Sequence, residues 1–222
     1  MIAVERKQAF LRKLERLSAY REIRNLMAEA AAAVNAHEGE RLKDCFAMRD
    51  PDLWVEFADE GLFIGADAVE ELLAFLLKGD LSKGNWTDLM LTTPIVELAG
   101  DGKTARGVWW CPVPMTLRGE DGSEEALWAW GNIAADFLLC GDAWKIWHLH
   151  YFRLFKCRYE DGWVDDLSRI NRLNLPAHPH SQPLTYHNPY SPLSVRDGIP
   201  PAPPRYDSYT DSAWMTETRK DR

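Results

Sequence analysis

Apolar residues recur every three or four positions in the first part of the chain and predict helices there. Residues 5–36 form the longest such stretch, with a break expected near Ser18, and its apolar positions are Leu11, Leu14, Leu17, Ile23, Leu26 and Met27. A short helix at 38–46 and another helix at 66–77 follow. Between these two helices, residues 53–57 and 62–64 predict two short strands joined by a turn at 58–61.

From Trp86 onward polar and apolar residues alternate, as is typical of strands. The glycine-containing segments 100–102, 119–122 and 141–142 divide this region into four long strands joined by hairpins. Helices, two short strands, another helix and then a four-stranded meander predict an α+β domain at residues 1–163. We expect a cone-shaped half-barrel, in which a curved antiparallel sheet wraps around the N-terminal helices.

The composition changes in the last quarter of the chain. Residues 176–205 hold most of the 13 prolines, interleaved with Tyr186 and Tyr190, so a regular element cannot persist there. Residues 164–222 are therefore either a mobile tail or an extended Pro/Tyr-rich arm that packs on its own cone or on a neighbouring subunit. The aromatic residues favour the arm, because disordered segments are usually poor in them.

Charge and composition exclude several classes of partner. The formal net charge of -8 disfavours nucleic acid, since phosphate binding requires clustered Lys and Arg. No apolar run is long enough for a membrane span, and the charged N-terminus does not resemble a signal peptide, so the cytoplasm is the expected location. The four cysteines form no CxxC pair, which argues against a zinc or redox motif.

The meander carries a resemblance to a known family. Its segments are Thr-Pro-Ile-Val-Glu-Leu-Ala-Gly-Asp-Gly at 93–102, Trp-Ala-Trp-Gly at 128–131, Ala-Asp-Phe at 135–137 and Trp-Lys-Ile-Trp-His-Leu-His at 144–150. With Ile23–Leu26 and Glu60-Gly61, they resemble the SnoaL-like proteins of the nuclear transport factor 2-like superfamily, over roughly residues 15–157. The resemblance implies that superfamily's cone and chemistry without an organic cofactor. Relatives include ketosteroid isomerases, scytalone and bile-acid dehydratases, polyketide cyclases, and lyases of lignin-derived aromatics.

The catalytic residues of the dehydratases are missing from this chain. Where those enzymes have a Tyr, a His and an Asp, alignment places Ala30, Thr92 and Val113. A His-Glu pair of many SnoaL-like relatives is replaced by Pro114 and Met115. Either the site is rebuilt from other residues or the chain is not a catalyst.

Two histidines of the last strand are the leading catalytic candidates. Alternation puts His148 and His150 on the same face as Trp144 and Ile146, so we expect both to point into the cone. A histidine can give or take a proton near neutral pH, so we assign His148 as the acid–base group and His150 as its partner. The alternatives are hydrogen-bonded core histidines or a His-x-His metal site. A third metal ligand is not obvious, so no metal or cofactor is expected.

Three polar residues could assist the histidines. Asp136 could orient a histidine or act as a base, or simply meet solvent near a strand end. Asn132 could donate its amide to an enolate or carbonyl oxygen. Glu56, on a short strand, is a weaker candidate for substrate contact, because an edge-strand charge is usually solvated.

Tryptophans are the candidates for substrate contact. Trp109, Trp128 and Trp130 could stack on a flat ring, although the same density of tryptophan also fits a plain core. Met90 and Thr92 are further candidates for substrate contact. The alternative is that they pack in the core.

These observations predict a cofactor-independent lyase, dehydratase or isomerase that moves a proton on a hydrophobic aromatic or polycyclic molecule, such as a lignin-derived diaryl compound. The alternatives are a non-catalytic small-molecule-binding protein, a steroid- or polyketide-directed isomerase or cyclase, and an assembly subunit. An outer sheet face bearing Trp110 and Trp147, together with the arm, predicts a homodimer or larger homo-oligomer.

Overall fold

The computed structural model describes residues 2–78, 84–119 and 121–217. Its helices are α1 (Ile2–Asn35), α2 (Gly39–Asp44), α3 (Ala66–Leu76) and α4 (Gly162–Asp165), with a 3-10 turn at Ala213–Met215. Its strands are β1 (Trp54–Phe57), β2 (Gly61–Ile64), β3 (Trp86–Thr87), β4 (Ile95–Leu98), β5 (Thr104–Arg118), β6 (Glu124–Cys140) and β7 (Ala143–Arg158). No helix in the described ranges is long and apolar enough to cross a membrane.

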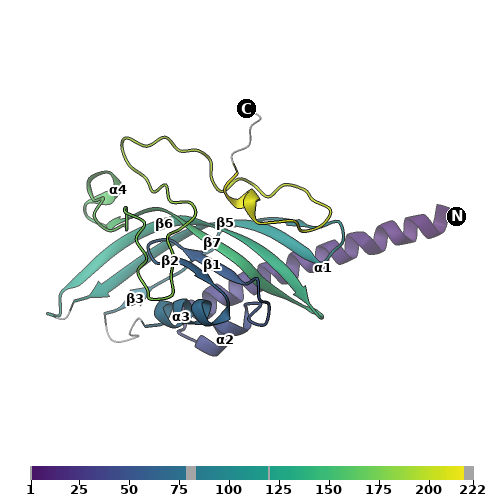
Figure 1. The fold of residues 1–222 in the computed structure, drawn as a ribbon, viewed down its shortest axis with the longest axis horizontal. Coiled ribbons are helices and arrows are strands. Elements are labelled where there is room, and N and C mark those ends of the chain that lie inside the picture. The colour runs from purple at the N-terminus through teal and green to yellow at the C-terminus, as the bar shows by residue number, and fades with distance from the viewer. Residues whose placement is uncertain (1, 79–83, 120, 218–222) are drawn as a thin grey trace.

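The strands form one curved, open sheet with helices on its inner face. The strand order is β2-β1-β7-β6-β5-β3, and β4 also pairs with β5. Helices α1, α2 and α3 lie on one side of this sheet, and most of the chain after β7 lies on the other (Figure 1). Near the β2 edge the chain reaches α3, where His178 packs against Phe75 and His180 bonds to Glu71. The core between helices and sheet includes Ile23, Leu72, Phe137 and Ile146, all fully buried. The predicted α+β cone is confirmed.

The sheet is mixed rather than wholly antiparallel. Strand β1 runs parallel to β7, with Trp54 opposite His148 and Glu56 opposite His150, whereas the other described pairs are antiparallel. The β1–β2 hairpin therefore extends the meander at its β7 edge. This pairing brings Glu56 of the first half of the chain beside the histidines of the last strand.

Helix α1 is uninterrupted, so the predicted break near Ser18 is wrong. Ser18 donates its hydroxyl to Glu22, one turn further on, at 2.7 Å, and the helix continues through both residues. The N-terminal half of α1 projects beyond the sheet (Figure 1). There Phe10 is 60% exposed, and Leu14 and Leu17 are exposed as well.

A β-bulge in β7 reverses the predicted orientation of the two histidines. Asp136 pairs with His148 but Phe137 pairs with Ile146, so Trp147 is an extra residue in β7. One extra residue moves all following side chains to the other face of a strand. Ile146 therefore faces the cone, whereas His148 and His150 lie on the outer face of the sheet. The expectation that both histidines point into the cone is wrong for this reason.

The arm covers the outer face of its own sheet. Most of the described residues 164–217 follow an extended path over that face (Figure 1). They form an apolar cluster with it, made by Val108, Ala134, Phe152, Ile199, Trp214 and Met215. Near the β1–β2 turn, Leu62 and Gln182 exchange backbone hydrogen bonds of 2.8 and 2.9 Å. Gly61 has φ of 125°, and a Cβ there would lie 2.6 Å from the Gln182 carbonyl oxygen, so this contact requires glycine.

Candidate functional site

An apolar cavity of about 310 Å³ lies inside the cone, between the helices and the inner face of the sheet. Its walls come from α1, α3 and the strands of the meander. The apolar residues that line it include Met27, Val34, Leu72, Phe75, Leu89, Leu91, Val113, Met115, Ile133 and Leu149. Such a lining suits a hydrophobic small molecule.

A network of polar side chains closes one part of this cavity. Tyr151 and Arg153 of β7 both border it, and Arg153 donates from Nη1 to the Tyr151 hydroxyl oxygen at 2.7 Å. Arg153 also donates from Nε to a carboxylate oxygen of Asp59 at 2.9 Å. Gly131 makes room for the ring of Tyr151, because a Cβ at that position would lie 2.4 Å from it. The hydroxyl of Tyr151 therefore keeps its own proton free for donation.

Lys156 also borders this cavity. Partial burial and the neighbouring Arg153 lower the pKa of Lys156 below its usual value, while Asp59 and Glu60 oppose that shift. Burial raises the pKa of Tyr151, so this phenol stays protonated. Glu60 also borders the cavity and is held by His178 of the arm at 2.9 Å. The cavity thus combines a possible base, a hydrogen-bond donor and a fixed positive charge.

His148 lies outside the cone, in a buried polar cluster beneath the arm. Its Nδ1 is 3.2 Å from Asp136 and 3.0 Å from the hydroxyl oxygen of Ser212, and its Nε2 donates to the backbone carbonyl of Asp52 at 2.9 Å. Ser212 in turn donates to the same Asp136 oxygen at 2.5 Å. In a catalytic triad the serine and the aspartate contact different nitrogens of the histidine ring. Here Ser212 and Asp136 both contact Nδ1, and Nε2 bonds to a backbone carbonyl, so this cluster is not a serine-nucleophile triad.

Asp136 is the centre of that cluster. It is fully buried, and its second carboxylate oxygen accepts from the Trp214 indole at 2.8 Å. Arg106, which is 5% exposed, has its Nε 3.8 Å from Asp136 and donates from Nη2 to the Asp211 carbonyl at 2.9 Å. The cluster joins the sheet to arm residues more than 60 positions away, so in this arrangement it fastens the arm.

His150 forms a separate buried pair with Glu56. The two side chains are 3.3 Å apart, and both oxygens of Glu56 accept hydrogen bonds from Thr185 of the arm, at 2.9 and 2.6 Å. Burial raises the pKa of Glu56, and the Thr185 bonds oppose that shift. Complete burial and nearby His187 lower the pKa of His150 to about 3, so this imidazole is neutral.

The neutral, buried His150 predicts acid destabilisation. The unfolded chain protonates this histidine below its usual pKa of 6.5, whereas the folded chain does not until about pH 3. Stability is therefore fully present above pH 6.5 and is lost as pH falls. Lowering the pH from 7.5 to 5.5 should reduce the free energy of unfolding by about 1.4 kcal/mol through protonation of His150 in the unfolded chain.

Urea unfolding at both pH values would measure this loss. The His150→Gln variant should lose about 1.4 kcal/mol less stability than the wild type over the same pH change. The other five histidines are common to both proteins, so their contributions cancel in this comparison. An equal loss in both proteins would show that His150 is not the responsible group.

The remaining predicted contacts lie elsewhere in the fold. Trp109 faces inward but is 2% exposed, packed edge-on against Phe137 in the core at 5.8 Å between centroids. Trp128 and Trp130 sit on the outer face, paired across it with Pro114 and Pro112 of β5, so they do not floor the cone.

Met90 and Thr92 do not border the cone cavity. Leu89 and Leu91 do, and Met90 and Thr92 alternate with them and are exposed. Asn132 lies on the outer face with Asp136, and it borders a different cavity beneath the arm.

Sequence reasoning missed Tyr151, Arg153 and Lys156. Once the bulge at Trp147 is known, alternation places Leu149, Tyr151 and Arg153 in the cone. Lys156 joins them because Leu154 is a second extra residue in β7, between the Gly131–Arg153 and Trp130–Phe155 pairs. No group of three or more metal-ligating side chains occurs among residues 2–78, 84–119 and 121–217.

The helices and the open, curved sheet enclose an apolar cavity, as in the nuclear transport factor 2-like superfamily. A family model for the SnoaL-like domain matches residues 15–150. The chain therefore belongs to the SnoaL-like family. Among curated protein sequences, none matches the chain.

Solved structures with the same fold share little sequence with this chain. A scytalone dehydratase candidate from Novosphingobium aromaticivorans is 13% identical with a TM-score of 0.57, over 72% of this chain and 99% of that one. A type 2 hexachlorocyclohexane dehydrochlorinase, LinA, is 15% identical with a TM-score of 0.55, over 66% and 92%. A LinA type 3 from Novosphingobium barchaimii is 14% identical with a TM-score of 0.52, over 66% and 93%. At these identities the likeness shows the fold alone.

Proposed function

We propose that the cone cavity binds a hydrophobic, ring-bearing small molecule and that the protein is a cofactor-independent lyase, dehydratase or isomerase. The observation that carries this proposal is the meeting of Lys156, Tyr151 and Arg153 at one apolar cavity. Dehydratase and dehydrochlorinase structures with this fold give the reaction class further support. The chemistry in each case is the removal of a proton and of a leaving group.

Each polar residue has a distinct role in this proposal. Lys156, with its lowered pKa, takes a proton from substrate carbon. Tyr151 donates a hydrogen bond to the substrate oxygen that gains charge or departs. Arg153, fixed by Asp59, stabilises the negative charge through Tyr151.

The cavity's lining and size favour an aromatic substrate. A volume of about 310 Å³ is near the lower end of ligand pockets, so one or two rings fit better than a steroid. A lignin-derived diaryl compound remains the leading example. A non-catalytic binding protein of the same fold is the rival, because the dehydratase residues are replaced by Ala30, Thr92 and Val113.

Incubation of the purified protein with aromatic alcohols, ethers and ketones of one or two rings would test the proposal. We expect new product from at least one compound without added metal or cofactor, detected by chromatography and mass spectrometry. Saturable binding of such compounds without any product would favour the binding protein instead.

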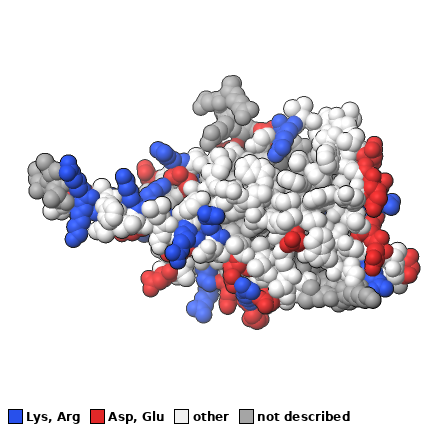
Figure 2. Space-filling view, turned by 180° about the vertical axis from the view of Figure 1, so that it is seen from behind, with Lys and Arg blue, Asp and Glu red and all other residues white. Residues whose placement is uncertain are grey.

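We also propose that the protein is a homo-oligomer. The outer sheet face was expected to mediate assembly, but the arm of the same chain covers part of it. Trp147 on this face is 8% exposed and packs against Tyr209 of the arm. The projecting half of α1 still exposes Phe10, Leu14 and Leu17, and a helix without tertiary packing is marginal in water. Figure 2 shows Lys and Arg gathered along this projection and a broad uncharged area over the body.

Light scattering at micromolar concentration should give at least twice the 25.4 kDa chain mass. A Leu14→Glu variant should shift the mass toward the monomer if α1 forms the contact. A monomeric wild-type protein would contradict the proposal.

A further inference from the structure

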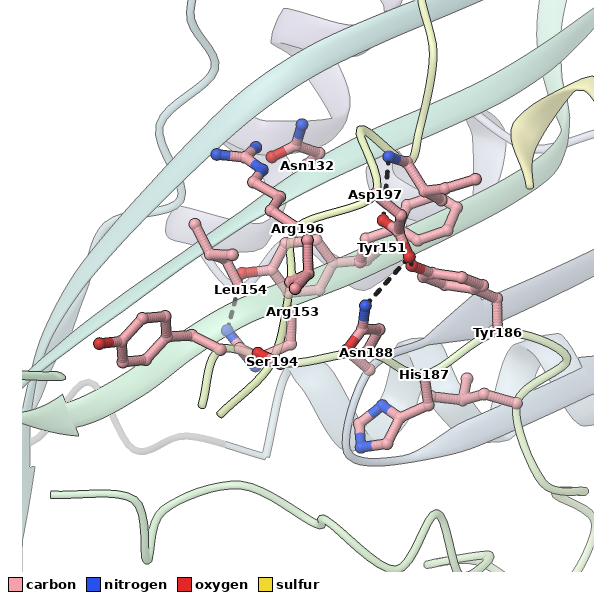
Figure 3. Close-up of a pocket in the computed structure, with 16 residues that line it drawn as sticks. Asn132, Tyr151, Arg153, Leu154, Tyr186, His187, Asn188, Ser194, Arg196 and Asp197 are labelled. Atoms are coloured by element: carbon pink, nitrogen blue, oxygen red, sulfur yellow. Dashed lines mark hydrogen bonds between the residues drawn. The ribbon is translucent and has the colours of Figure 1, made fainter. Parts of the chain in front are cut away.

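A second cavity, of about 280 Å³, lies between the outer face of the sheet and the arm. Asn132 of β6 and Phe152 of β7 border it on the sheet side, and Tyr186, Arg196 and Ile199 of the arm border it on the other (Figure 3). Strand β7 separates this cavity from the cone, since Tyr151 and Arg153 border both. We call it the arm cavity.

The Asn132 side chain is the most informative group in the arm cavity. The residue is 6% exposed, and its side chain forms no hydrogen bond within the described residues, so its amide is open to the cavity. Asn132 borders the cavity, so a polar atom of a bound ligand would satisfy it.

Arg196 gives the same part of the cavity a positive charge. Figure 3 shows its guanidinium group on the same side of the cavity as the Asn132 amide. Within the described part of the chain, Arg196 forms no ion pair. The nearby carboxylate of Asp197 is already bound by Tyr186, by Asn188 at 3.0 Å and by the Ile199 amide at 3.3 Å. Asp197 therefore shapes the arm loop, while Arg196 is free to meet an anion.

Aromatic side chains supply the apolar wall. The ring of Phe152 stacks on His150 at 3.6 Å and meets Tyr186 edge-on at 5.8 Å between centroids. His187 also borders the cavity, and its buried Nε2 has no partner in the described residues. Flat rings pack well on such a wall, and a polar substituent could reach the imidazole.

We propose that the arm cavity is a second ligand site that binds a small planar aromatic carboxylate. The carboxylate lies between the Arg196 guanidinium and the Asn132 amide, and the ring lies against Phe152 and Tyr186. Charge-assisted hydrogen bonds to Arg make the carboxylate preferable to a neutral amide. This inference is independent of the reaction proposed for the cone.

Isothermal titration of the full-length protein with benzoate would test this site. We expect saturable binding, weaker by about tenfold for the neutral benzamide and for the Arg196→Gln variant. Cyclohexanecarboxylate should also bind more weakly than benzoate, because its ring is not planar. Asn132→Leu should reduce binding by a similar factor, provided its thermal transition shows that it folds.

Two control variants separate this site from other sources of binding. Arg205→Gln removes another exposed charge of the arm that does not border the cavity, and Lys156→Met alters the cone. Both should bind benzoate within about twofold of the wild type. Absence of saturable binding would overturn the proposal. So would binding that Lys156→Met abolishes, or binding that Arg196→Gln and a folded Asn132→Leu leave unchanged.

Discussion

Replacing Lys156 with Met should lower turnover by about 10²- to 10⁴-fold on a substrate identified in the aromatic screen. The substitution keeps an unbranched apolar side chain at the cavity wall but removes the amine that takes the proton. Substrate affinity should change little, because the apolar lining is intact. Steady-state kinetics and equilibrium binding together would separate these two effects.

The pH profile gives a second measure of the same role. A base must be neutral to act, so activity should rise as pH increases through the pKa of Lys156, which lies below the usual 10.5. Lys156→Arg keeps a positive charge that cannot be lost, and it should be as inactive as Lys156→Met. Activity retained in Lys156→Arg would show that the charge matters and proton transfer by the amine does not.

The histidine hypothesis makes the opposite prediction. If His148 is the acid–base group, His148→Ala should lose turnover and Lys156→Met should not. The structure places His148 beneath the arm, with Nε2 bound to the Asp52 carbonyl, so we expect its loss to affect stability first. Unfolding and turnover measured on the same His148→Ala preparation would distinguish the two hypotheses.

Local patterns were sufficient to predict the fold. The three- and four-residue spacing of Leu and Ile predicted the helices, and the glycine segments predicted the hairpins of the meander. Gly102, Gly122 and Gly141 have positive φ at those turns, as expected for glycine in a hairpin. The parallel pairing of β1 with β7 was not predictable, because it depends on contacts between segments about 90 residues apart.

The candidate site was harder to predict because alternation was assumed to be unbroken. The single bulged residue Trp147 moved His148 and His150 to the outer face and brought Tyr151 and Arg153 into the cone. Nothing in the local sequence distinguishes a bulge there from a regular strand. The partners of Asp136 and Glu56 were equally hidden, since Ser212 and Thr185 belong to an arm without periodicity.

Replacing Asp136 with Ala should destabilise the protein by about 3–5 kcal/mol, because it leaves Arg106 as a buried charge without its carboxylate. It also removes the acceptor for the Trp214 indole and for the Ser212 hydroxyl. The arm should therefore detach from the sheet more often. Urea unfolding would measure the first effect, and limited proteolysis of residues 200–217 would measure the second.

Milder variants keep the test informative if Asp136→Ala fails to fold. Ser212→Ala removes one hydrogen bond to Asp136 and should lose about 1–3 kcal/mol, with faster cleavage of the arm. Asp142→Ala, in the exposed turn between β6 and β7, removes a carboxylate of the same length and should stay within about 0.5 kcal/mol of the wild type. An arm that is cleaved at the wild-type rate in a folded Ser212→Ala variant would show that the Asp136 cluster does not hold it, and that the apolar contacts of Trp214 and Met215 alone keep it in place.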